Sequence, residues 1–226
     1  MKRTFRVTFA TLAILLTGFF VYSQLSDNNF LSKKILKKKG GVTNIRELRT
    51  GDIIFQTTSS RQCKAVQLAT HSKYSHCGML FKDNTGVFVI EAIQPVCITP
   101  FDEWISRGVG GHYVIQRLKN ADKVITKDVE AKLKKTADEY VGKNYDIYFG
   151  WDDDAIYCSE LVWKVYKRVT GIELGKLQKL KDFDLTSDAV KLELKERYGN
   201  KIPLEEPVIS PSGIMESELL TTVKSE

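Results

Sequence analysis

The sequence lacks the spacings by which proteins most often hold metal ions and nucleotides. Its four cysteines form no C-x-x-C pair, and its three histidines form no H-E-x-x-H motif. It also contains no glycine-rich phosphate loop, no internal repeat and no low-complexity tract. We therefore expect a protein that works without a bound metal ion or cofactor.

The chain also lacks a basic excess outside its N-terminal region. The first 41 residues carry eight lysines and arginines against Asp27 alone, a net charge of +7. Because the whole chain has a net charge of +6, the remaining residues sum to −1. A nucleic-acid-binding domain needs a basic surface, so the charge distribution argues against a nucleic-acid partner.

The first 23 residues have the pattern of a targeting segment. Basic residues precede an apolar run over residues 7–22, and Val21 to Ser23 offer a site for signal peptidase. The run is shorter than the roughly 20 residues that a membrane-spanning helix needs. We expect a cleaved signal peptide, with an uncleaved N-terminal anchor as the alternative. No cysteine lies in this segment, which excludes a lipoprotein anchor. The protein is therefore expected to be exported, either to the periplasm or to the cell envelope.

Residues 24–43 have the composition of a basic spacer. Five lysines between Lys33 and Lys39 could contact anionic lipid headgroups at a membrane surface. A solvated linker helix that ends at Gly40 is the favoured alternative.

Residues 44–222 are long enough to bury a full hydrophobic core, and their pattern mixes helices and strands. Asp52 follows the turn at Gly51 and is assigned a structural role. Thr99 is expected to cap a short helix with Pro100 in its first position. The expected strands cover residues 53–55, 74–81, 87–92, 96–99 and 112–118, and the expected helices begin near residues 60, 100, 126 and 158.

Cys158 begins an amphipathic run after an acidic loop. Leu161, Val165 and Val169 recur at helical spacing, which places Cys158 in the first turn of a helix that packs on the core. The free N–H groups and the positive end of the helix dipole favour a thiolate there. This environment suits a nucleophile, while a buried structural cysteine is the alternative.

A hairpin brings a candidate base and a candidate acid together. The loop of residues 82–86 has the composition of a turn, and a register that pairs Phe81 with Phe88 places His76 opposite Ile93. Glu91 then lies on the same face, diagonal to His76. A shift of one residue would separate the two side chains. The pair suits a general base and the acid that orients it.

Three other groups are weaker candidates. His112 is a rival base, but it begins a strand after a Gly-rich loop and has no acidic neighbour in sequence. Tyr145 could support an oxyanion, although a packing role is favoured. A disulfide among Cys63, Cys77 and Cys97 is conceivable in an oxidising compartment, and it would leave one of the three unpaired.

Several motifs together resemble a known family. The segments at residues 51–55, 67–78, 89–92 and 157–162 are similar, in this order, to the YiiX-like permuted papain-type enzymes of the NlpC superfamily. The resemblance covers about residues 45–222. It implies an α+β fold, circularly permuted relative to papain, in which an antiparallel sheet or small barrel packs against helices. It also implies the nucleophile Cys158, the base His76, the orienting acid Glu91, and a C-terminal segment that packs back near the site. Cys77 departs from the family pattern, where an apolar residue is usual.

The expected activity is thiol hydrolysis. A Cys158–His76 ion pair would attack an amide carbonyl, form a thioester and release it to water. A cell-wall peptide is the favoured substrate. A lipid amide or ester, or acyl transfer, is the alternative that uses the same residues, and a non-catalytic envelope-binding module is the third hypothesis.

Overall fold

The computed structural model describes residues 45–226, of which residues 47–226 form one compact unit. The expected signal segment or anchor and the spacer with Lys33 to Lys39 lie outside the described residues. In the part of the chain that is described, no helix is long and apolar enough to span a bilayer.

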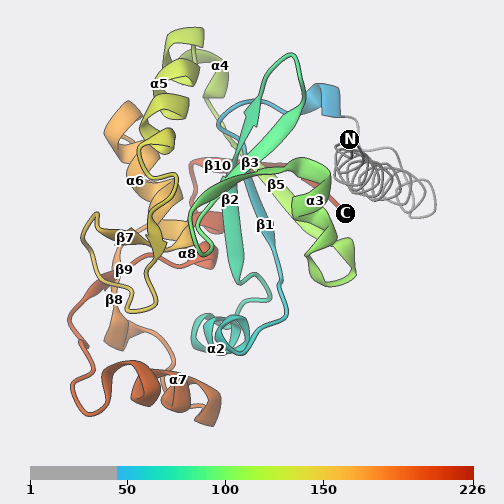
Figure 1. The fold of residues 1–226 in the computed structure, drawn as a ribbon. Coiled ribbons are helices and arrows are strands. Elements are labelled where there is room, and N and C mark those ends of the chain that lie inside the picture. Colours follow the sequence, from blue (N-terminus) through green and yellow to red (C-terminus); the bar gives the residue numbers. More distant parts are fainter. Residues whose placement is uncertain (1–44) are drawn as a thin grey trace, which may run out of the picture. The chain divides into compact units, whose positions relative to one another are not determined.

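A six-stranded antiparallel sheet forms the centre of this unit, with the strand order β10-β5-β1-β2-β3-β4 (Figure 1). Its strands are β1 (Ile53–Gln56), β2 (His76–Lys82), β3 (Val87–Glu91), β4 (Cys97–Pro100), β5 (Tyr113–Leu118) and β10 (Leu220–Ser225). Two short pairs lie apart from it: β6 (Asn144–Tyr145) with β7 (Ala155–Ile156), and β8 (Gln178–Lys179) with β9 (Pro207–Val208).

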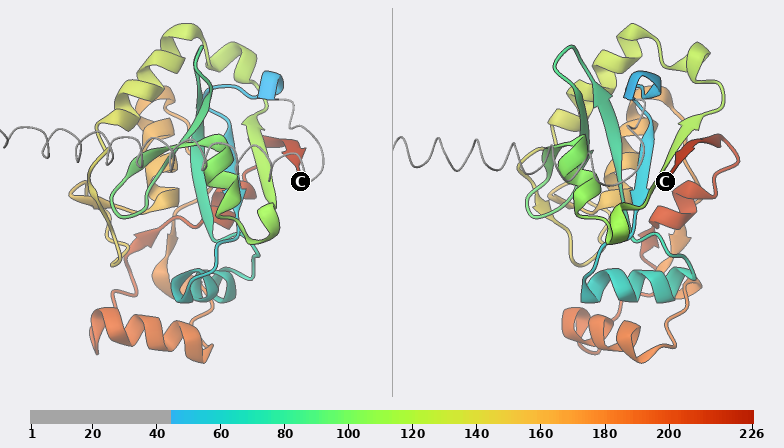
Figure 2. Two further views of the ribbon diagram at one scale, coloured as in Figure 1. Left: turned by 45° about the vertical axis from the view of Figure 1, so that its right-hand side comes forward. Right: turned by 90° about the vertical axis from the view of Figure 1, so that its right-hand side faces the viewer.

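Helices cover both faces of the sheet. The helical elements are η1 (Ile45–Glu47), α2 (Arg61–Thr70), α3 (Phe101–Ser106), η2 (Val109–Gly111), α4 (Ala121–Val124), α5 (Lys127–Asp138), α6 (Cys158–Thr170), η3 (Leu180–Asp182), α7 (Asp188–Tyr198) and α8 (Pro211–Met215). Helix α6 packs against β2 with α5 beside it, while α3 lies on the opposite face (Figures 1 and 2). The predicted α+β class, with an antiparallel sheet packed against helices, is confirmed.

Helix α6 follows from its sequence. Leu161, Val162 and Val165 are fully buried, as the helical spacing predicted. The helix ends at Gly171, whose φ of 75° is the left-handed conformation that glycine adopts without a steric penalty. These features place Cys158 in the first helical turn, at the margin of the hydrophobic core.

The hairpin of β2 and β3 has the predicted register. Phe81 pairs with Phe88, which sets His76 and Glu91 near the same end of the hairpin. Gly78 permits a close approach of the two strands, since a Cβ atom there would lie 2.5 Å from the Val89 side chain and 2.7 Å from the Ile90 carbonyl oxygen.

The start of α3 differs from the prediction. The helix begins at Phe101, so Pro100 is the residue before it and not its first position, and no side chain caps it. Thr99 is not the cap because its hydroxyl donates a hydrogen bond to Glu91 Oε1 at 2.5 Å. The cap prediction was therefore wrong.

Asp52 has the structural role that was predicted. Its carboxylate accepts hydrogen bonds from Arg49 N at 2.8 Å and from Arg117 Nε at 2.7 Å, and it is buried. It thus ties the turn before β1 to the neighbouring strand β5.

The C-terminal segment returns to the start of α6. Strand β10 pairs with β5 and extends the sheet at one edge. Before it, Ile209 N donates to the Tyr157 hydroxyl at 3.1 Å and Ile209 O accepts from Ser159 Oγ at 2.8 Å. The residues on both sides of Cys158 are therefore held by a segment about 50 positions further along the chain.

Candidate active site

Cys158 is the first residue of α6 and is almost fully buried, with 4% of its surface exposed. Tyr157 precedes it in an extended conformation, and Tyr157 N donates to Glu160 Oε2 at 3.3 Å. The N–H of Cys158 has no acceptor within the helix, because the first helical N–H groups never do. The sulfur and this N–H group therefore share the N-terminal end of the helix.

His76 and Glu91 are joined at the end of the hairpin. His76 Nε2 lies 2.7 Å from Glu91 Oε2, and both residues are buried. Since Nε2 faces the carboxylate, Nδ1 is the ring nitrogen left for the hydrogen bond with the Cys158 thiol. Cys158, His76 and Glu91, which come from a helix and two strands, are thus brought together, with His76 interacting with both of the other side chains.

Glu91 is fully buried and has three partners. Besides His76, its carboxylate accepts hydrogen bonds from the Thr99 hydroxyl and from the Arg107 guanidinium. The ring of Trp104 stacks on His76, with centroids 5.9 Å apart. These contacts hold the acid in one orientation and limit the access of water to its bond with the imidazole.

The electrostatics favour a charged pair of thiolate and imidazolium. Burial opposes the charge on His76, but hydrogen bonds with Cys158 and Glu91 outweigh it and raise its pKa to about 10. Hydrogen bonding from Cys77 and from His76 lowers the pKa of Cys158 well below its usual range, despite burial. Burial also opposes the Glu91 charge, yet its bonds with His76, Thr99 and Arg107 lower its pKa. All three shifts therefore favour the charged forms of these groups.

This charge state predicts unusual reactivity toward iodoacetamide. At pH 6 the labelling rate of Cys158 should exceed that of an ordinary thiol, which with a pKa of about 8.5 is only about 0.3% ionised there. Reactivity should fall only as the pH drops through the lowered pKa of Cys158, because only the thiolate reacts. Intact-mass measurement and peptide mapping across pH 4 to 9 would report it, with the partly buried Cys63 as an internal comparison. Parallel pH profiles for Cys158 and Cys63 would contradict the ion pair.

Tyr145 lies beside the thiol. Burial and the nearby charge of Cys158 raise its pKa well above the usual value, so its hydroxyl stays protonated. The oxygen accepts a hydrogen bond from Gln62 Nε2 at 2.8 Å, which leaves the phenolic proton available as a donor.

His112 is exposed and, within residues 45–226, pairs with no acidic side chain. The structure thus brings Tyr145 to the site and leaves the rival base without an orienting partner.

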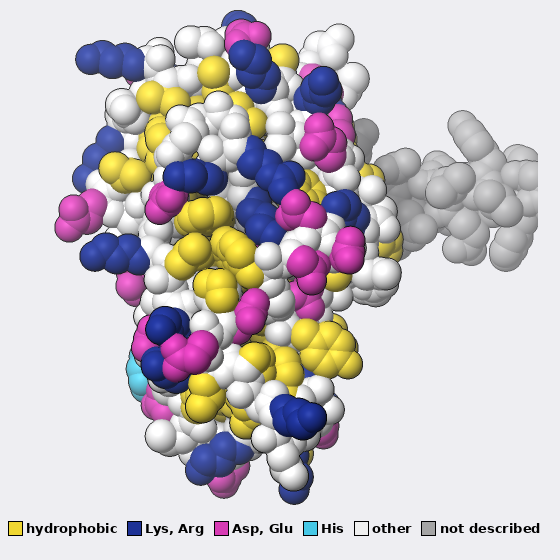
Figure 3. Space-filling view, turned by 90° about the vertical axis from the view of Figure 1, so that its left-hand side faces the viewer, with side chains coloured by type: hydrophobic (Ala, Val, Ile, Leu, Met, Phe, Trp, Pro, Cys, Tyr) yellow, Lys and Arg dark blue, Asp and Glu magenta, His cyan; other side chains and the backbone are white. Residues whose placement is uncertain are grey.

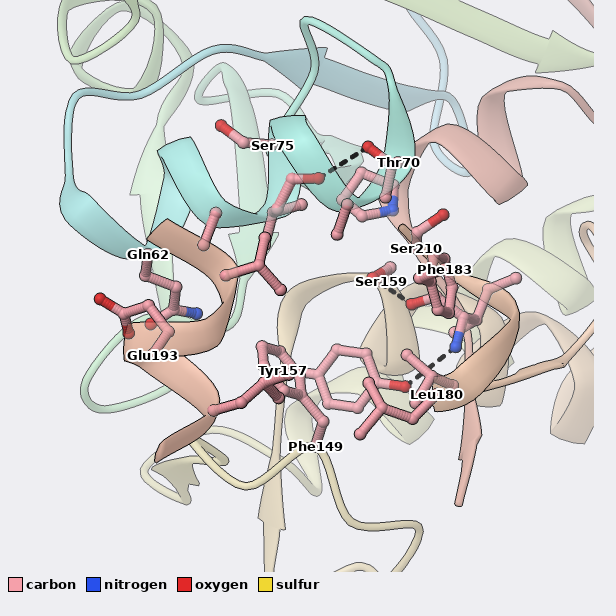
Figure 4. Close-up of a pocket in the computed structure, with 18 of the residues that line it drawn as sticks. Gln62, Thr70, Ser75, Phe149, Tyr157, Ser159, Leu180, Phe183, Glu193 and Ser210 are labelled. Atoms are coloured by element: carbon pink, nitrogen blue, oxygen red, sulfur yellow. Dashed lines mark hydrogen bonds between the residues drawn. The ribbon is translucent and has the colours of Figure 1, made fainter. Parts of the chain in front are cut away.

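An apolar cavity of about 100 Å³ adjoins Cys158 (Figure 4). It lies among α2, the start of α6, α7 and the segment around β9, and Figure 4 shows the rings of Phe149 and Tyr157 on one side of it. Most of its lining side chains are hydrophobic: Ala65, Val66, Ala69, Phe149, Tyr157, Leu180, Phe183, Leu185, Val190, Leu194, Val208, Ile209 and Pro211. Its polar groups include Gln62, Tyr145, Glu193 and Arg197.

The loop between β6 and β7 also carries exposed apolar side chains. Ile147 is 46% exposed and Tyr148 is 53% exposed, directly before the cavity residue Phe149. On the side of the molecule that bears this loop and α7, hydrophobic side chains gather between charged ones (Figure 3).

Some site residues escaped the sequence analysis. Arg107 follows a short helix and Gln62 lies in the first turn of another, and neither position has a spacing that relates it to Cys158. Thr99 was predicted to cap a helix, whereas in the structure its hydroxyl donates to Glu91. Cys77 had one signal, its position beside His76 where the resembling family has an apolar residue. All four cysteines are free thiols in the structure, so none of the conceivable disulfides is formed.

The fold and the site together define the papain-like class of thiol hydrolases. A cysteine at a helix N-terminus faces a histidine on a sheet, and here the histidine and its acid precede the cysteine in sequence, which is the permuted order. The family model described as "Permuted papain-like amidase enzyme, YaeF/YiiX, C92 family" matches residues 47–224. The chain belongs to this family.

Two proteins of Escherichia coli illustrate the relationship. The uncharacterized protein YiiX of strain K12 is 50% identical over 178 residues, which cover 79% of this chain and 87% of that protein. The crystal structure of YiiX from strain O157:H7, also 50% identical, superposes with a TM-score of 0.75 and covers 79% of this chain and 97% of that one.

The YiiX protein of strain O157:H7 is described as a metalloprotein. Within residues 45–226 of this chain, no three side chains of His, Cys, Asp or Glu are grouped so that they could hold a metal ion.

Proposed function

We propose that this protein is a thiol amidase in which Cys158 is the nucleophile, His76 the general acid and base, and Glu91 the residue that orients His76. The hydrogen bond between His76 and Glu91, beside a sulfur at a helix N-terminus whose pKa is lowered by His76, is the observation that carries the proposal. The family membership supports the amidase class.

The reaction follows from the charges of these groups. The Cys158 thiolate attacks the carbonyl carbon of an amide, and His76 donates its proton to the leaving nitrogen as the C–N bond breaks. The acyl group is then held as a thioester on Cys158. Neutral His76 accepts a proton from water, hydroxide attacks the thioester, and the carboxylic acid leaves as the thiolate is restored.

The developing oxyanion needs donors close to the sulfur. The N–H of Cys158 is one, because it is free at the helix start and turns toward the same end as the thiol. The Tyr145 hydroxyl is the second, since Gln62 occupies its oxygen and leaves its proton free. Tyr145 is therefore proposed to bind the oxyanion and not merely to pack.

The substrate is proposed to carry an apolar acyl group. The cavity next to Cys158 is lined mainly by aliphatic and aromatic side chains from four separate parts of the chain. If each carbon atom needs about as much cavity volume as one water molecule, the cavity admits on the order of eight carbon atoms. This observation favours the lipid amide or ester, which the sequence left as the alternative, over the cell-wall peptide.

A panel of acyl lengths tests this substrate. With N-acyl-7-amino-4-methylcoumarin substrates, kcat/KM should rise by roughly 100-fold or more from acetyl to octanoyl, because each buried methylene contributes up to about 0.8 kcal/mol. Peptide amides derived from peptidoglycan should be cleaved more slowly than the octanoyl compound. Release of the fluorescent amine measures both.

A pair of matched variants localises the effect. Val190→Phe fills part of the cavity from helix α7 and should cut the octanoyl rate at least tenfold while sparing the acetyl rate. Val141→Phe makes the same change at an exposed position and should leave both rates alone. If peptide amides react fastest and acyl length has no influence, the acyl assignment is wrong and the cell-wall peptide takes its place.

A further inference from the structure

A second thiol lies in contact with the proposed nucleophile. Cys77 follows His76 in strand β2 and is fully buried, and helix α6 packs on this strand. Cys77 and Cys158 belong to one buried cluster, and the Cys77 thiol and backbone N–H interact with the Cys158 sulfur closely enough to lower its pKa. In the proposed hydrolysis this thiol neither attacks the substrate nor transfers a proton to it.

The two sulfurs are ionised unequally, which suits attack on an oxidant. The lowered pKa of Cys158 favours its thiolate, and the thiolate is the form that peroxides oxidise. Burial and the charge of Cys158 raise the pKa of Cys77, which therefore keeps its proton. The pair thus combines a thiol that favours the thiolate with one that favours its proton, in the same buried cluster.

We propose that Cys77 and Cys158 form a reversible disulfide when hydrogen peroxide oxidises the active site. The Cys158 thiolate attacks one peroxide oxygen, the O–O bond breaks, and the leaving hydroxide takes up a proton to become water. The sulfur of Cys77 then attacks the sulfenic sulfur, the S–O bond breaks, and the Cys77 proton leaves with the oxygen as a second water. Two thiols lose two electrons, and one peroxide gains them.

The position of Cys77 makes this outcome favourable over the competing ones. A sulfenic acid reacts further with peroxide to sulfinic acid unless a thiol meets it first. Cys77 already lies in the same buried cluster as Cys158 and interacts with its sulfur, whereas Cys63 bonds to the Thr58 hydroxyl at 2.7 Å and Cys97 contacts Thr99. The disulfide removes the nucleophile from catalysis but preserves its sulfur for reduction.

Peroxide titration of the full chain tests the proposal without any substrate. The wild-type protein should lose about 2 Da on oxidation, the mass of two hydrogens, and non-reducing peptide mapping should find the Cys77–Cys158 cross-link. Dithiothreitol should then restore at least nine-tenths of the iodoacetamide labelling of Cys158. This readout requires a reactive thiolate but no amidase activity, although the inference rests on the same proposed nucleophile.

Three variants make the test decisive. Cys77→Ser retains a hydroxyl that can donate to Cys158 but cannot form the disulfide, so it should gain about 32 Da as a sulfinic acid and recover less than one-tenth of its labelling. Cys77→Ala serves in the same way if the serine variant does not fold. Cys63→Ser, a matched change at a part-buried thiol, should behave as the wild type.

Two results would overturn the assignment. In one, the wild-type protein accumulates sulfinic acid at Cys158 without a cross-link. In the other, the cross-link joins Cys158 to Cys63 and persists in Cys77→Ser. Since neither readout involves hydrolysis, a failure here leaves the amidase proposal standing, while failure of the acyl-coumarin assay leaves the disulfide standing.

Discussion

Replacement of His76 by alanine should lower kcat/KM for amide hydrolysis by about 10³ to 10⁴-fold, and Cys158→Ala should abolish covalent turnover. Without the imidazolium, the thiolate loses one of the hydrogen bonds that lower its pKa, and the leaving amine loses its proton donor. The two losses act on the same step, so the double variant should be no worse than Cys158→Ala alone.

The rate of fluorescent amine release would measure this effect, with thermal unfolding as a check on folding. His112→Ala is the matched control, because His112 is exposed and belongs to no hydrogen-bonded acid pair among the described residues. It should retain nearly full activity. If His112→Ala loses activity and His76→Ala keeps it, the assignment of the base is reversed.

Replacement of Glu91 by alanine should destabilise the protein by about 3 to 5 kcal/mol, the cost of removing one partner of a buried ion pair. Glu91 is fully buried, and its loss leaves His76, Thr99 and Arg107 without their shared acceptor. Urea unfolding at pH 7 would measure the change. Glu205→Ala removes a carboxylate that also contacts two cations, Lys179 and Lys181, but at an exposed position, and it should change stability little.

The contribution of Glu91 to the free energy of unfolding should depend on pH. The pKa of Glu91 is lower in the folded state than in the unfolded chain, so its contribution is present above the unfolded pKa of about 4.3 and is lost as the pH falls through the folded value. The stability gap between wild type and Glu91→Gln should therefore narrow in acid. A gap that is constant from pH 7 to pH 3 would show that the Glu91 charge does not matter.

Glu91→Gln should also change the catalytic profile. In the wild-type protein, activity should fall as the pH rises through about 10, where His76 loses the proton that the leaving group needs. The neutral amide of the introduced glutamine has no charge that holds the proton on His76. The descending limb of the pH–activity profile should therefore move to lower pH in the variant. A structural role alone would reduce activity without moving this limb.

The parts of the site that the sequence predicted correctly depend on short-range patterns. Helical spacing after Cys158 and the turn composition between Phe81 and Phe88 are local, and each fixes its neighbours within a few residues. Because side chains alternate along a strand, one correct register was enough to bring His76 and Glu91 together. These predictions needed no knowledge of how the helix meets the sheet.

The parts that were missed or misassigned depend on contacts between distant segments. Thr99 has the sequence context of a helix cap. In the structure its hydroxyl instead donates to the buried carboxylate of Glu91, and no side chain caps the helix. Arg107 reaches Glu91 only because α3 lies across the sheet face. The C-terminal residues around Ile209 line the cavity although they lie about 50 positions after Tyr157 in sequence. No periodicity in the sequence predicts this contact.

The sequence by itself therefore determined the amphipathic helix that presents Cys158, the hairpin that pairs His76 with Glu91, and the absence of a net basic charge after residue 41. Only the tertiary structure decided what surrounds them: the Arg107 and Thr99 support of Glu91, the thiol of Cys77 against Cys158, and the apolar cavity. The physical reason is that local backbone preferences act over a few residues. Hydrogen-bond partners and cavity walls are instead selected by the packing of helices against both faces of one sheet.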